Sequence, residues 1–212
     1  MATGRPLIRA DLQLIADIVE PGSRVLDVGC GDGSLLYYLA TVKEVDARGI
    51  EISSDGVNAG VSAGLSVIQG NAETDLFDYP DNTFDYVILS RTLQAMHAPK
   101  TILEQLLRIG RRAIVSFPNF GHWRLRWSLL LTGRMPKNAL LADEWFTSPN
   151  IHLCSIRDFV TLCAEKGIVI ERGLFVDEKG TPRPLGRSLL LANNLGEQAV
   201  FLLRSHCVNG KK

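Results

Sequence analysis

Residues 25–33 read Val-Leu-Asp-Val-Gly-Cys-Gly-Asp-Gly, and the next apolar run closes on Glu51. The pattern predicts a buried strand, a glycine turn, a helix and a second strand that ends in a carboxylate. In a parallel sheet this layout builds a nucleotide-type ligand site beyond the carboxyl ends of the strands. The glycines allow the backbone to approach a ligand closely, and the N–H groups that open the helix can bind an anion. We expect Glu51 to accept hydrogen bonds from ribose hydroxyl groups.

The spacing of the glycines discriminates between nucleotide ligands. A dinucleotide-binding loop reads Gly-x-Gly-x-x-Gly, whereas here Ser34 stands at the third position and Gly33 comes one residue earlier. This spacing disfavours an NAD-linked enzyme. The resulting Gly-x-Gly-x-Gly loop, preceded by Asp27 within the strand, resembles motif I of the class I S-adenosylmethionine (SAM) methyltransferases. The alternative is a glycine turn that only packs the helix onto the strand.

The resemblance to these methyltransferases implies which residues would contact SAM. Asp27 would order the loop and bind the amino group of SAM, with a purely structural cap as its alternative role. Ile52 would lie against the adenine ring. Asn71 stands where an acidic residue usually accepts from the adenine amino group, and asparagine can still accept through its side-chain oxygen. Backbone atoms of Ser90 and Arg91 would contact the methionine part. The predicted cofactor-binding residues are Asp27, Gly29, Cys30, Gly31, Gly33, Glu51, Ile52, Asn71, Ala72 and Ser90.

The methyl-acceptor side carries no clear motif. Methyl transfer from a sulfonium is an in-line displacement that needs orientation more than a strong base. His97 and His122 are the candidate catalytic residues, because histidine alone transfers protons readily near neutral pH. Each has an alternative role, as a loop residue or as a hydrogen-bonding group within its segment. The wider acceptor-side candidates are His97, Asn119, His122, Trp123 and Trp145, while His152 and His206 read as structural.

The composition excludes several classes of protein. The 212 residues suffice for one domain with a large core, and Lys plus Arg equals Asp plus Glu at 23 each. A general nucleic-acid or anionic-membrane binder would normally show a basic excess. No apolar run approaches the roughly 18 residues of a membrane helix, and residues 1–6 lack the apolar core of a signal peptide. We therefore expect a cytoplasmic protein with neither a nucleic-acid nor a membrane partner.

The four cysteines, Cys30, Cys154, Cys163 and Cys207, form no Cys-x-x-Cys pair. Their scatter fits reduced thiols in a cytosol rather than a zinc or redox centre, so no metal is expected. Cys30 lies inside the glycine loop, where it is either a reactive thiol or a small residue that fits a crowded turn.

Strands alternate with helices along the chain, which predicts βαβ units and a mostly parallel sheet. The expected fold class is α/β, and the resemblance implies one Rossmann-like class I methyltransferase domain over residues 1–212. The seven predicted strands match the seven-stranded sheet of that class, whose last strand is antiparallel. The predicted strands are 24–28, 48–52, 65–69, 84–89, 113–117, 168–175 and 199–203, and the predicted helices are 7–20, 34–40, 53–63, 101–109 and 155–167.

Residues 118–150 interrupt this pattern. They hold all three tryptophans, three prolines and an arginine-rich patch. We interpret the segment as an insertion or lid over the carboxyl end of the sheet. A polar loop at 177–188 and a C-terminal tail complete the chain.

Several later segments identify a narrower resemblance. They read Pro-Asp-Asn-Thr-Phe-Asp-Tyr-Val (80–87), Leu-Gln-Ala-Met (93–96), Ser-Phe-Pro-Asn-Phe-Gly-His-Trp-Arg (116–124), Gly-Arg-Met-Pro (133–136) and Trp-Phe-Thr-Ser-Pro-Asn-Ile-His-Leu-Cys (145–154). With the glycine loop they resemble the MetW family of methionine-biosynthesis proteins over about residues 9–205. The resemblance implies a bacterial cytosolic SAM-binding protein that acts with homoserine O-acyltransferase as an accessory or regulatory partner. The alternative is a SAM-dependent methyltransferase acting on an unidentified small molecule, with the insertion as its acceptor lid.

Overall fold

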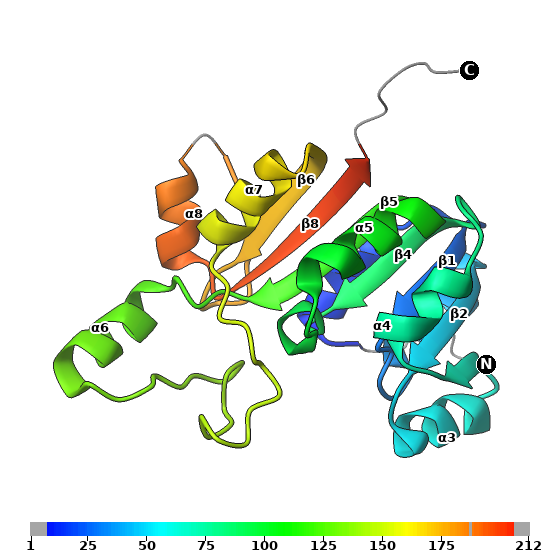
Figure 1. The fold of residues 1–212 in the computed structure, drawn as a ribbon, viewed down its shortest axis with the longest axis horizontal. Coiled ribbons are helices and arrows are strands. Elements are labelled where there is room, and N and C mark those ends of the chain that lie inside the picture. The colour runs from blue at the N-terminus through cyan, green and yellow to red at the C-terminus, as the bar shows by residue number, and fades with distance from the viewer. Residues whose placement is uncertain (1–7, 187, 206–212) are drawn as a thin grey trace, which may run out of the picture.

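The described part of the chain forms one eight-stranded sheet in the order β3-β2-β1-β4-β5-β8-β6-β7 (Figure 1). The computed structural model describes residues 8–186 and 188–205. β1 to β5 pair in parallel, while β8 is antiparallel to both β5 and β6. The α/β fold and the antiparallel last strand are thereby confirmed. The strands are β1 Arg24–Val28, β2 Asp46–Glu51, β3 Ser66–Gln69, β4 Phe84–Ser90, β5 Gly110–Pro118, β6 Ile168–Val176, β7 Pro182–Pro184 and β8 Gln198–Ser205.

The strand count of seven was wrong, because the loop predicted at 177–188 contains the short strand β7. Its three residues are exposed and pair antiparallel with the end of β6. Two of the three are prolines, which cannot donate to a ladder and are confined in sheets to edges and bulges. The edge position removes that conflict, but a proline-rich segment gives no strand signal in the sequence.

Helices cover both faces of the sheet, as a parallel sheet requires. Alternate residues of the strands point to opposite faces, so Tyr86 and Ile88 pack with α1 and α2, while Val87 and Leu89 pack with α5 and α7. The helices are α1 Ala10–Ile18, α2 Ser34–Lys43, α3 Ser54–Ser62, α4 Ala72–Asp75, α5 Pro99–Ile109, α6 Trp123–Thr132, α7 Ile156–Glu165 and α8 Leu189–Leu195, with 3-10 turns η1 Leu76–Asp78 and η2 Leu93–Ala95. No helix of the described ranges 8–186 and 188–205 is long and apolar enough to cross a membrane.

α7 begins at a Ser-x-x-Asp pattern, Ser155 to Asp158, which is typical of the start of a helix. Ser155 Oγ accepts from Asp158 N at 3.2 Å, and Asp158 Oδ2 accepts from Ser155 N at 3.1 Å, which is a capping box. α8 had no such clear signal. Its Leu-Leu-Leu-Ala-Asn-Asn-Leu run is too short for its periodicity to separate helix from strand.

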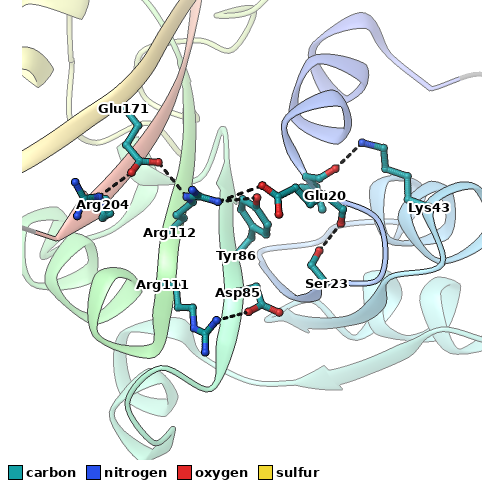
Figure 2. Close-up of polar contacts among 10 residues, drawn as sticks. Glu20, Ser23, Lys43, Asp85, Tyr86, Arg111, Arg112, Glu171 and Arg204 are labelled. Atoms are coloured by element: carbon teal, nitrogen blue, oxygen red, sulfur yellow. Dashed lines mark hydrogen bonds and ion pairs between the residues drawn. The ribbon is translucent and has the colours of Figure 1, made fainter.

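A network of charged side chains lies at the opposite end of the sheet from the glycine loop (Figure 2). Arg112 Nε is 3.0 Å from Glu171 Oε2, and Arg112 Nη1 is 3.4 Å from Glu20 Oε1. Arg204 Nε lies 2.7 Å from Glu171 Oε1. The network joins the segment after α1 to β5, β6 and β8. Because these side chains pair with one another and are partly exposed, we assign them a modest structural role.

Candidate functional site

The glycine loop has backbone angles that only glycine adopts freely. Gly29, Gly31 and Gly33 have φ of 74°, 56° and 78°. A Cβ at Gly29 would lie 2.9 Å from Thr92 Oγ1, and one at Gly33 would lie 2.6 Å from Leu65 Cδ1. The loop thus packs tightly between the segments that follow β4 and α3, with no room for a side chain at Gly29 or Gly33. The glycines are needed for the shape of the loop as well as for ligand access.

A cavity of about 570 Å³ opens beside this loop, at the carboxyl ends of β1 and β4. Of the predicted cofactor-binding residues, Asp27, Gly29, Cys30, Gly31 and Ser90 line it. The remaining lining comes from the glycine loop, α1 and the segment before it, the start of α2, the ends of β4 and β5, and segment 138–150. These further lining residues are Ile8, Arg9, Leu12, Asp32, Ser34, Leu35, Arg91, Pro118, Leu140, Asp143, Pro149 and Asn150.

Asp27 is a buried acid that lacks a partner. Its side chain is 2% exposed, and Oδ1 has no hydrogen-bond partner among the described residues. Burial, and then the nearby charge of Glu51, raises the pKa of Asp27 to about 7. Buried polar atoms in folded proteins are normally satisfied, so the orphaned oxygen indicates a missing donor or cation.

Glu51 is oriented by two backbone groups. Its Oε2 accepts from Gly31 N at 2.8 Å and its Oε1 accepts from Ser53 N at 2.9 Å, which fixes both oxygens. A carboxylate has about four acceptor positions, so each oxygen keeps capacity for one further donor. Glu51 is 8% exposed, while the neighbouring Ile52 is 67% exposed and presents an apolar surface. This arrangement could hold a ribose beside an adenine ring.

Asn71 and Ala72 follow β3, next to the end of β2. Asn71 Oδ1 accepts from Glu73 N at 2.9 Å and so caps α4, and Ala72 is buried. The cap uses one of the two acceptor positions of the oxygen. The contact of Asn71 with an adenine amino group stays a prediction, as does the whole set of cofactor contacts.

Cys30 packs against the β2 backbone. A Cβ placed on Gly49 would lie 2.6 Å from Cys30 Sγ. Burial first, and the charges of Asp27 and Glu51 next, raise the pKa of the Cys30 thiol to about 12. Because only the thiolate is a strong nucleophile, the structure favours the packing role for this cysteine.

The two candidate catalytic histidines lie outside the cavity lining. His97 is exposed, with Nδ1 2.8 Å from Glu73 Oε2, at the start of α5. His122 is 1% exposed and caps α6 by accepting from Arg124 N at 3.4 Å. Its Nε2 is 3.4 Å from Glu178 Oε1 without the alignment of a hydrogen bond, and burial lowers the pKa of His122. Their catalytic roles stay predictions, and the structure gives each a local structural role.

Asn119 is a buried hub rather than an open acceptor-side group. Its Nδ2 donates to the carbonyl oxygens of Asn193 and Gly196 at 2.9 and 2.7 Å. Its Oδ1 accepts from the backbone N–H groups of Gly121 and Ile156 at 2.9 and 3.1 Å. The amide thereby joins the start of the insertion to α7 and α8.

Replacing Asn119 with alanine is expected to lower the free energy of unfolding by roughly 3 kcal/mol, because buried backbone groups lose their partners. Chemical denaturation monitored by circular dichroism would measure the change. The exposed Asn58→Ala on α3 is the matched control and should change stability by less than about 0.5 kcal/mol. Equal stability of both variants would contradict this role of Asn119.

The insertion forms a second cavity of about 970 Å³. Trp145, 75% exposed, lines it together with both apolar and charged residues, whereas Trp123 lines neither of these two cavities. Asp143 and Asn150 line both cavities, so segment 138–150 is a common wall between them.

Within residues 8–186 and 188–205, no three His, Cys, Asp or Glu side chains are grouped so as to hold a metal ion.

The contributions of α1 and segment 138–150 to the first cavity have no local signal in the sequence. Both reach the glycine loop through tertiary packing. Arg91 is a partial exception. Its position just after the predicted strand 84–89 already places its backbone at the carboxyl edge of the sheet, where the site was expected. Its left-handed φ of 59° is a feature only of the folded chain.

Solved structures share this fold at low sequence identity. A SAM-dependent methyltransferase from Thermotoga maritima is 17% identical with a TM-score of 0.66, covering 93% of this chain and 88% of that one. One from Archaeoglobus fulgidus is 14% identical with a TM-score of 0.64, covering 92% of each chain. The cyclase SpnF is 18% identical with a TM-score of 0.65, covering 92% of this chain and 80% of its own. The chain therefore has the class I SAM-dependent methyltransferase fold, a fold that by itself does not assign a reaction.

The sequence relatives narrow this class. The family model described as methionine biosynthesis protein MetW matches residues 9–203, so the chain belongs to the MetW family. The bifunctional methionine biosynthesis protein MetXA/MetW of Rhodopirellula baltica is 35% identical over 179 residues, 80% of this chain and 29% of the relative. The demethylmenaquinone methyltransferase of Renibacterium salmoninarum is 30% identical over 150 residues, 66% of this chain and 61% of the relative. The chain thus spans less than two thirds of the length of either relative.

Proposed function

We propose that this protein binds SAM and acts in methionine biosynthesis, in the cytoplasm, as an accessory or regulatory partner of homoserine O-acyltransferase. The observation that carries the proposal is the relative whose name joins MetXA to MetW in one polypeptide. We take MetXA to be the homoserine acyltransferase. Covalent fusion keeps two activities at high effective concentration, which favours pairs that work together.

SAM binding is supported by the division of the site into two parts. Glu51, Ile52 and Asn71 at the ends of β2 and β3 would hold the adenosine part. Asp27 and the glycine loop would hold the amino-acid part, because the orphaned Asp27 oxygen suits an ammonium group. SAM would supply a sulfonium-bound methyl group here, while this chain's own residues bind and orient the ligand.

The surface of α6 suits a partner protein. Trp123, Trp127, Leu130 and Leu131 stand at i, i+4, i+7 and i+8, which places them along one side of the helix. They are 40%, 53%, 74% and 75% exposed, and Leu125 is the buried residue of α6. Figure 1 shows α6 extending away from the sheet. An apolar helix face of this kind fits a groove on another protein, and tryptophan is enriched at binding hot spots. We assign this α6 stripe to the acyltransferase.

The second candidate function is methyl transfer to a small molecule. The specific observation in its favour is the cavity of about 970 Å³, lined by both apolar and charged side chains, that shares Asp143 and Asn150 with the first cavity. An acceptor bound there would lie next to the proposed SAM site, with segment 138–150 as the lid.

The deciding experiment measures the rate of homoserine O-acyltransferase from the same organism with and without this chain. A large, saturable rise supports the accessory role, and SAM is then titrated for an effect on that rise. Regulation by SAM requires two states with different SAM affinity, and the wall shared by the two cavities is the candidate element that changes. An unchanged rate, where calorimetry demonstrates SAM binding, favours the methyltransferase and directs acceptor screening.

Changing Leu130 and Leu131 together to lysine is expected to reduce acyltransferase activation at least about 10-fold while SAM affinity is kept, because both side chains are exposed and line neither of the two cavities. The measurement is the concentration of variant chain that gives half-maximal activation. Leu190→Lys, on α8 and 63% exposed, is the matched control. Full activation by the double variant would exclude the α6 stripe as the docking surface.

A further inference from the structure

The turn after β4 holds Arg91 in a conformation that arginine rarely adopts. Its φ of 59° lies in the left-handed region, which imposes strain on a residue with a side chain. Two sets of contacts impose the conformation. Arg91 N donates to Ser116 O at 2.8 Å, and Thr92 Oγ1 donates to Ser90 O at 2.9 Å while its side chain packs over Gly29. Such strain persists where the surroundings enforce it, and it concentrates at ligand sites.

The guanidinium of Arg91 is incompletely neutralised. Its closest ion-pair contact is a long one, with Nη1 3.9 Å from Asp11 Oδ2, and within the described ranges it donates no hydrogen bond. Asp11 is already engaged, because it accepts from Arg9 Nε and Nη2 at 3.2 Å each and from Gln198 Nε2 at 3.4 Å. Two guanidinium groups therefore share one carboxylate, which leaves a net charge of about +1 in this group.

The environment of Arg91 makes an added anion favourable. Its side chain is 27% exposed, and burial lowers the pKa of its guanidinium because water is partly excluded. Guanidinium presents five donors in a planar fork that matches a carboxylate. Both Arg91 and Arg9 line the cavity that also holds Asp27.

The same cavity thus contains a buried acid without a partner among the described residues and a cation whose nearest carboxylate, Asp11, is shared with Arg9. A ligand end that carries both an ammonium and a carboxylate would satisfy both groups at once. We propose that Arg91 binds the α-carboxylate of the amino-acid end of SAM, with Asp27 facing the ammonium and Arg9 supplying further positive charge. This inference rests on the proposed SAM binding and makes the site selective for the zwitterionic ligand.

A structural role for Arg91 predicts something different. If the residue only secures α1 through Asp11, its loss would weaken the site without regard to the charge of the ligand. Two ligands that differ only in the carboxylate separate these roles.

Calorimetry of SAM and decarboxylated SAM with wild type and Arg91→Asn is the test. Asparagine tolerates the left-handed region, so the turn keeps its shape while the charge is removed. We expect the variant to bind SAM roughly 10- to 100-fold more weakly and decarboxylated SAM within about 3-fold of wild type. Arg111→Asn, at the opposite end of the sheet, should alter neither affinity.

Equal weakening for both ligands, or no weakening for either, would overturn the role of Arg91. Equal affinity of the wild type for the two ligands would overturn it as well, and would leave SAM binding standing. If the wild type binds neither ligand, the proposed function fails together with this inference, so the two failures are distinguishable.

Discussion

Asp27→Asn is expected to stabilise the ligand-free protein at pH 8 and to weaken SAM binding. Asp27 is buried, no group of the described residues donates to its Oδ1, and its pKa is raised from 3.8 to about 7. Ionising such a group in the folded state costs free energy that the unfolded chain does not pay. One pKa unit corresponds to about 1.4 kcal/mol, so the shift sets an upper limit of roughly 4 kcal/mol on the gain.

The sign of the pH dependence follows from proton binding. Between pH 3.8 and about 7 the folded wild type binds more protons at Asp27 than the unfolded chain does. The contribution of Asp27 to stability is therefore greatest below pH 3.8 and is lost as the pH rises through about 7. The difference in unfolding free energy between Asp27→Asn and wild type should accordingly increase from pH 5 to pH 8.

Denaturant titrations at several pH values, paired with calorimetry of SAM, measure both effects. SAM affinity should fall roughly 10- to 100-fold, because the asparagine amide brings no charge to pair with the ligand ammonium. Asp17→Asn, an exposed residue of α1, is the control that should leave SAM affinity unchanged. A constant stability difference across the pH range would refute the assignment of a raised pKa to Asp27.

Glu51→Ala is expected to reduce SAM affinity at least about 100-fold. The substitution removes the proposed acceptor for the ribose hydroxyl groups, and it also leaves Gly31 N and Ser53 N without their shared partner. The glycine loop would lose one of its anchors to β2, so the binding surface itself would be less ordered. Calorimetric titration of SAM is the measurement, with circular dichroism to establish that the variant is folded.

Glu104→Ala, on the exposed side of α5, provides the matched control. Glu104 pairs with Lys166, and neither residue lines the cavity beside the glycine loop. Its SAM affinity should equal that of wild type. Wild-type affinity in a folded Glu51→Ala variant would remove the ribose contact from the proposal and with it the strongest part of the cofactor assignment.

The sequence was most informative where short-range rules apply. The glycine loop, the start of α2 and the carboxylate at the end of β2 follow from spacing within about 25 residues, because a strand, a turn and a helix each leave a local pattern. The capping box of α7 is equally local. These elements position the centre of the site, and the structure places them where the pattern indicates.

The remainder depends on contacts between distant segments. The lining contributed by α1 and segment 138–150 requires the complete fold. Asn119 was a candidate acceptor-side residue on sequence grounds, and only its four hydrogen bonds identify it as a hub. β7 and α8 were missed because a proline-rich edge strand and a seven-residue leucine run carry weak periodicity.

The position of β8 has a consequence for how the chain matures. β8 is the last strand along residues 8–186 and 188–205, yet it lies between β5 and β6 in the sheet. During synthesis, β6 and β7 are made before β8. They can join the sheet only when residues 198–205 have left the ribosome and paired between β5 and β6. Until then, β5 presents an unpaired edge, the kind of surface on which nascent chains associate wrongly. Closure of the sheet therefore depends on β8, the last of these strands to be synthesised.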